Sequence, residues 1–166
     1  MVKLREEARN LVRRSAPIAP SEGAVINDQR NTHTEDITAW PQARVDRNIA
    51  TISAAGMGEF DFHSTKRESL VRFLRTAAAQ GKSVLIVLPE SPLYRSAFVS
   101  APVRERFEEM LTEALKQVPG TICIRLDRVT ELQSDQYYWD FIHLNVQGQT
   151  IATKALLAQL AANGIQ

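Results

Sequence analysis

Cysteine is almost absent from this sequence: Cys123 is the single cysteine among 166 residues. A lone cysteine excludes an internal disulfide framework and a cysteine-rich zinc site. Cys123 stands between Ile122 and Ile124, and such an apolar run is typical of a small buried side chain rather than of a reactive thiol. We therefore expect neither a disulfide nor a metal or other cofactor.

Long apolar runs and an excess of charge are also lacking. No stretch approaches the ~18 apolar residues of a membrane span, and the N-terminus has no apolar core of a signal peptide. The net charge is +1, from 20 Lys and Arg against 19 Asp and Glu, which gives no reason to expect nucleic acid as a partner. The sequence thus predicts a soluble chain, and its 166 residues fit one folded domain.

The first 64 residues are weakly patterned. Residues 3–14 have helical spacing with basic side chains on the remaining surface, which is either a solvated face or a face that docks on an anionic membrane or a partner. Residues 16–42 show no sustained period and predict a loop, with a short strand at 24–26. Residues 44–54 give a weak helical signal. We separate this N-terminal segment, 1–64, from a better patterned one, 65–166.

The second segment alternates between helical and strand patterns. A capping box at Thr65 and Glu68 starts a helix that stops before Gly81. The elements that follow are a strand over 83–88, a helix over 102–117, a strand over 121–126 and a helix over 146–162. This order predicts an α/β fold with a parallel sheet flanked by helices, and the unbroken apolar strands predict cover on both faces.

Two buried strands do not complete such a sheet, because both outer edges would leave unpaired backbone groups. We expect further strands from the first sixty residues, from a second copy of the chain in a homodimer, or from a partner chain. The sheet is therefore predicted to be incomplete in the patterned segment alone.

Asp140 and His143 stand three residues apart in an aromatic and aliphatic stretch. In a catalytic triad, a histidine takes a proton from the nucleophile and a carboxylate holds the imidazole in the correct tautomer. Asn145 is a good N-cap for the last helix and would hold His143 in the preceding loop, where Trp139 is a further cleft candidate. The alternative is that Asp140 caps locally and His143 is half-buried under Trp139.

A nucleophile is harder to find, because no Gly-x-Ser-x-Gly motif or other glycine-flanked serine occurs. Ser91 and Ser96 follow the first strong strand and are the nearest candidates. Pro92 lacks the backbone N–H that often helps to form an oxyanion hole, so we expect Ser91 to shape a turn and the nucleophile to lie elsewhere. Tyr94 and Arg95 are expected to line the cleft or to pair with acids.

Several of these motifs together resemble the C-terminal half of an SGNH (GDSL-type) hydrolase, over about residues 66–162. The resemblance lies in the strand Val84-Leu-Ile-Val-Leu-Pro with its Ser-Pro-Leu-Tyr loop, and most specifically in Asp140-Phe-Ile-His143-Leu-Asn-x-x-Gly148. The sequence most resembles the bacterial branch of this family, which includes cell-envelope esterases and O-acyltransferases. The resemblance implies a flavodoxin-like fold, Asp140 and His143 as triad members, an acylated small molecule or carbohydrate as substrate, and an extracytoplasmic location within a larger envelope protein.

The sequence also departs from that family. The Gly-Asp-Ser nucleophile block is absent, and the Asn27-Asp28 pair precedes the strands instead of lying between them. We therefore expect the later part of a once larger enzyme, inactive or nearly so alone. Two alternatives stay open: a non-catalytic interaction module that pairs through an exposed sheet edge, and a metal-assisted enzyme that uses Asp127 with Asp140 and His143.

Overall fold

The structure is a computed structural model that describes residues 33–55, 60 and 64–165. These residues belong to one compact unit of the chain, which spans 31–166. The helix expected over 3–14 and the short strand expected over 24–26 lie outside the described residues.

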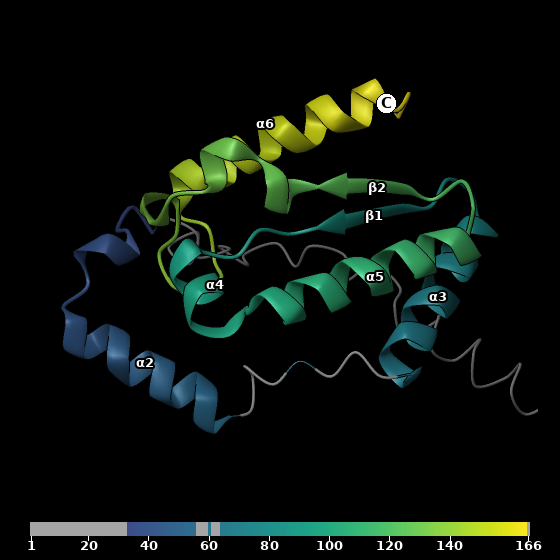
Figure 1. The fold of residues 1–166 in the computed structure, drawn as a ribbon. Helices are drawn as coiled ribbons and strands as arrows, with labels where there is room; N and C mark the ends of the chain where they lie inside the picture. The colour runs from purple at the N-terminus through teal and green to yellow at the C-terminus, as the bar shows by residue number, and fades with distance from the viewer. Residues whose placement is uncertain (1–32, 56–59, 61–63, 166) are drawn as a thin grey trace, which may run out of the picture. The chain divides into compact units, whose positions relative to one another are not determined.

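The described part is a mixed α/β structure with far more helix than strand (Figure 1). The predicted helices and strands of the second segment are present, with bounds within two residues of those expected. In chain order the elements are η2 (Ile37–Ala39), α2 (Gln42–Ala54), α3 (Ser64–Ala78), β1 (Val84–Val87), α4 (Pro92–Phe98), α5 (Ala101–Gln117), β2 (Ile122–Arg125), η3 (Leu126–Arg128), η4 (Thr130–Leu132), η5 (Asp135–Tyr137) and α6 (Val146–Ala162). Within the described residues, no helix is long and apolar enough to cross a membrane.

The two strands run parallel, with Val84 opposite Ile122 and Val87 opposite Arg125. In the part of the chain that the structure describes, they pair only with each other. The prediction that both faces are fully covered is wrong for β1: Ile86 is 38% exposed, and Leu88, which follows the strand, is 67% exposed. An apolar run indicates that a strand favours burial, but it does not show which other parts of the chain or which partner would cover the strand.

Helices lie on the two opposite faces of the β1–β2 pair (Figure 1). On one face, Leu74 of α3 and Ala114 of α5 form a core on which Leu85 of β1 packs. On the other face, Ile124 of β2 and Ala152 of α6 belong to a separate core. Residues that alternate along a strand point to opposite faces, so β1 contributes Leu85 to one core and Val84 to the other.

A third core connects the start of the described chain to the loop that carries Asp140 and His143. Ile37 and Val45 are buried there with Tyr94, Tyr138 and Phe141. The backbone N–H of Ile37 also donates to the carbonyl of Tyr138 at 2.8 Å. This stretch of the weakly patterned segment, predicted as a loop up to residue 42, thus packs against the predicted catalytic loop.

One helix was missed by the sequence reasoning. Residues 90–95 were expected to form a loop, but α4 begins at Pro92. The Ser91 side chain accepts a hydrogen bond from the N–H of Tyr94, and Pro92 occupies the first turn, where its missing N–H costs no helical hydrogen bond. A serine followed by proline is itself a helix-start signal, but seven residues are too few to show a helical period in the sequence.

Candidate functional site

The structure brings Asp140 and His143 into direct contact. Nδ1 of the His143 ring lies 2.7 Å from Oδ2 of Asp140. The other carboxylate oxygen, Oδ1, accepts the backbone N–H groups of Ile142 at 2.9 Å and of His143 at 2.7 Å. An ionised carboxylate only accepts hydrogen bonds, so Nδ1 is the protonated nitrogen and Nε2 of the neutral ring carries the free lone pair.

The ring of His143 is open to solvent. Its side chain is 60% exposed, whereas that of Asp140 is 21% exposed. One face of the ring stacks on Trp139, with the centroids 5.4 Å apart and the planes inclined by 20°. Trp139 also stacks on His33 at 4.1 Å. The acid is thus partly shielded and the base is accessible, which is the division of roles that proton transfer to Nε2 requires.

The loop that carries the pair is anchored by a buried tyrosine. Tyr138 is 0% exposed, and its hydroxyl donates to the carbonyl of Leu132 at 3.1 Å. Burial raises the pKa of Tyr138 to about 12. The N–H of Trp139 then donates to the carbonyl of His143 at 3.1 Å, which closes the loop on itself. These contacts fix both ends of the segment that contains Asp140.

Asn145 has a structural role in this arrangement. It is 2% exposed, and its side-chain oxygen accepts the N–H of Gly148 at 3.0 Å, which makes it the predicted N-cap of α6. Its amide nitrogen donates to the carbonyl of Gln136 at 2.7 Å. Both ends of the amide are therefore used to join the loop to the helix, and no cleft-facing group is left for a substrate.

Ser91 is also enclosed. It is 0% exposed, and its Oγ accepts the N–H of Tyr94 at 3.0 Å. Its backbone N–H donates to the carbonyl of Phe141 at 3.1 Å, which joins the start of α4 to the loop that carries Asp140 and His143. Tyr94 is likewise buried and packs on Phe98, away from the open surface. In this structure Ser91 caps a helix and has no access to a substrate.

Within the described residues, no hydroxyl or thiol group forms a hydrogen bond with the imidazole. The only hydrogen bond of the His143 ring there is to Asp140. Ser96, the other candidate, donates its hydroxyl to the carbonyl of Leu93 at 2.9 Å. The described residues also contain no group of three or more side chains suited to a metal ion, and Asp127 is bound to Arg125 instead. The metal-assisted alternative therefore has no site in this part of the chain.

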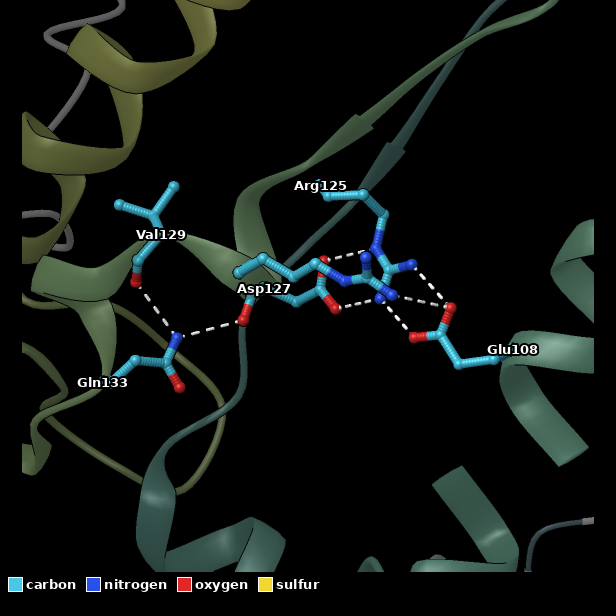
Figure 2. Close-up of polar contacts among 6 residues, drawn as sticks. Glu108, Arg125, Asp127, Val129 and Gln133 are labelled. Atoms are coloured by element: carbon cyan, nitrogen blue, oxygen red, sulfur yellow. Dashed lines mark hydrogen bonds and ion pairs between the residues drawn. The ribbon is translucent and has the colours of Figure 1, made fainter. Parts of the chain in front are cut away.

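A charged network at the end of β2 was not foreseen from the sequence (Figure 2). Arg125 donates to both oxygens of Asp127, at 2.7 and 2.5 Å, and to both oxygens of Glu108, at 2.7 and 2.5 Å. Arg128 reaches Glu108 at 3.0 Å. The hydrogen bond from Arg125 lowers the pKa of Glu108 to about 2. Bonds to Asp127 and Glu108 raise the pKa of Arg125.

A cavity of about 710 Å³ lies beside this network, at the carboxyl ends of β1 and β2. Arg95, predicted as a cleft residue, lines it, as do Arg125 and Asp127. Asp140 and His143 are not among its lining residues. The structure therefore separates the proton-transfer pair from the large cavity, although residues that follow β1, such as Glu90, and residues that follow β2, such as Gln133, both line it.

In comparisons with family models, with curated proteins and with solved structures, nothing matches this chain.

Proposed function

We propose that this chain carries the general-base half of an SGNH-type serine esterase or O-acyltransferase. The observation that supports the proposal most is the 2.7 Å contact between Nδ1 of His143 and Oδ2 of Asp140, with the ring exposed to solvent. A carboxylate held by two backbone N–H groups and aimed at an accessible imidazole is the arrangement that hydrolases use to activate a hydroxyl.

The proposed mechanism assigns one proton route. Nε2 of His143 accepts the proton of a hydroxyl nucleophile as the oxygen attacks the carbonyl carbon of an acyl ester, for which an acylated carbohydrate is the proposed source. Asp140 remains ionised and stabilises the imidazolium that forms. The imidazolium then returns the proton to the departing alcohol. The nucleophile is proposed to come from outside the described residues or from another polypeptide.

The same proposal extends to the architecture. β1 and β2 would be two strands of a larger flavodoxin-like parallel sheet, in which their carboxyl ends face the reaction site. The proposed location is outside the cytoplasm, as part of a cell-envelope protein. Support for the sheet comes from the parallel pairing of the strands and from the helices on both faces.

Hydrolysis of a chromogenic acetyl ester tests the role of Asp140 and His143. An accessible imidazole attacks such an activated ester slowly even without a serine, so we expect a rate close to that of free imidazole at equal concentration. His143→Gln should lower this rate to the contribution of the remaining histidines, and Asp140→Asn should also lower it, while Ser91→Ala should leave it unchanged. A fast reaction that Ser91→Ala abolishes would contradict the placement of the nucleophile.

A second candidate function is an interaction module that pairs through the open edge of the sheet. The exposed Ile86 and Leu88 favour this reading, since large apolar side chains beside an unpaired strand attract another chain. Sedimentation of the 166-residue chain over a range of concentrations tests self-pairing. We expect dimers that Leu88→Lys dissociates; a monomer at every concentration would contradict self-pairing.

A further inference from the structure

The cavity at the carboxyl ends of β1 and β2 has an apolar interior. Its volume of about 710 Å³ falls within the range of about 300–1,000 Å³ that is usual for small-molecule sites. Leu70 of α3 and Phe107 and Met110 of α5 line it, and each is half-buried. A ligand with an apolar body would remove these side chains from water, which favours binding in proportion to the area buried.

Three basic side chains from three different helices line the same cavity. They are Lys66 of α3, Arg95 of α4 and Arg104 of α5. Lys66 and Arg104 are exposed and Arg95 is half-buried, so these charges lie toward solvent relative to the apolar walls. Within the described residues, none of the three side chains forms a hydrogen bond or an ion pair. Their hydrogen-bond donors are therefore available to a ligand.

The acidic side chains of the cavity do not balance these charges. Five basic and three acidic side chains line it. Two of the acids, Glu108 and Asp127, are bound by Arg125, as Figure 2 shows. Glu90 is the acid that remains, and it faces both Arg95 and Arg104 electrostatically. The cavity thus combines an apolar interior with an uncompensated positive rim.

We propose that this cavity binds an anionic amphiphile, meaning an apolar chain that ends in a carboxylate or phosphate head. The chain lies against Phe107 and Met110, and the head accepts charge-assisted hydrogen bonds from Arg95 and Arg104. Because Asp140 and His143 do not line the cavity, this inference does not rest on the proposed esterase function.

Calorimetric titration of the full 166-residue chain with a matched set of eight-carbon ligands tests the proposal. We expect octanoate and octyl phosphate to bind, and their relative affinity identifies the preferred head. 1-Octanol and octyltrimethylammonium should bind at least tenfold more weakly. Shortening octanoate to hexanoate removes two methylenes and should raise the Kd by about fifteenfold, because each buried methylene contributes about fourfold. Equal binding of all four heads, or no binding of either anion, would overturn the proposal.

Variants on a single helix separate a specific site from general charge attraction. Arg104→Gln should raise the Kd of octanoate by about fivefold to tenfold at low ionic strength. Arg106→Gln is the matched control, because Arg106 is exposed on the same helix but does not line the cavity. Equal weakening by both variants would show that octanoate responds only to overall charge. Circular dichroism verifies that each variant keeps its helical content.

Discussion

Gly148 in the first turn of α6 lies directly against the backbone of Tyr137. A Cβ atom added at Gly148 would overlap the carbonyl oxygen of Tyr137 and would come within 2.9 Å of Cδ2 of Leu144. The obstacle is a backbone atom, which cannot rotate away. This close approach sets the distance between α6 and the loop that carries Asp140 and His143.

Gly148→Ala should therefore destabilise the fold by about 2–3 kcal/mol, because the added methyl group must displace backbone that is already packed. Urea unfolding followed by circular dichroism measures the change. Gln147→Ala, at an exposed position in the same helical turn, serves as the control and should change the free energy of unfolding by less than about 0.5 kcal/mol. Equal stability of Gly148→Ala and the control would show that α6 can move outward at no cost.

Asn145 joins the same helix to the preceding loop, and its removal should be costly. Asn145→Ala loses the cap on Gly148 and leaves the carbonyl of Gln136 without its partner. We expect a loss of about 2 kcal/mol, the sum of a helix cap and a partly buried hydrogen bond. Ser100→Ala removes the exposed cap of α5 and should cost about 0.5–1 kcal/mol. A smaller loss at Asn145 than at Ser100 would contradict this account.

The sequence predicted these local features well because each depends on neighbouring residues. The helical period of 44–54, the apolar runs of the two strands and the cap at Asn145 were all confirmed. The contact between Asp140 and His143 was expected for the same reason, since three residues separate them. Local geometry then limits the imidazole to a few positions near the carboxylate.

Features that depend on distant residues were not predictable in this way. Arg125 and Glu108 are 17 residues apart on different elements, and nothing in their spacing indicates that they meet. The exposure of Ile86 was also missed, because an apolar run does not reveal whether a neighbouring strand is present to cover it.

Asp140→Asn should change which ring nitrogen of His143 carries the proton. The carboxylate accepts the Nδ1–H bond, whereas an amide in its place can donate to Nδ1 and so favours the Nε2–H tautomer. Nitrogen-15 chemical shifts of the neutral imidazole measure the tautomer directly. We expect Nδ1–H to predominate in the wild type and Nε2–H to increase in the variant. Identical shifts in both proteins would mean that Asp140 does not orient the ring.

Glu108 should stabilise the fold above acidic pH. Its folded-state pKa of about 2 lies below the ordinary value of 4.5, so this stabilisation is present above pH 4.5 and is lost as the pH falls toward 2. The side chain is 34% exposed, and solvent screening reduces the expected contribution to about 1–2 kcal/mol. Glu108→Gln should lower the free energy of unfolding by this amount at pH 7 and by much less near pH 2. Glu109→Gln, an exposed neighbour, is the control.

Glu90 should have the opposite effect. Burial raises the pKa of its carboxyl group above 4.5, and the charges of Arg95 and Arg104 counteract burial only in part. The folded state therefore binds the Glu90 proton more tightly than the unfolded state. Protonated Glu90 thus stabilises the fold below pH 4.5, and this stabilisation is lost as the pH rises through the folded-state pKa. Ionised Glu90 then costs stability at neutral pH, because a partly buried charge has given up water.

Glu90→Gln should consequently increase the free energy of unfolding at pH 7 and leave it nearly unchanged at pH 4. The same change removes the acid that faces Arg95 and Arg104, so octanoate should bind more tightly to the variant at pH 7. Urea unfolding at the two pH values and calorimetric titration provide the two readouts. A loss of stability at pH 7 would mean that Glu90 forms a favourable ion pair with Arg95. Such a pair would also leave Arg95 less able to bind an anionic head.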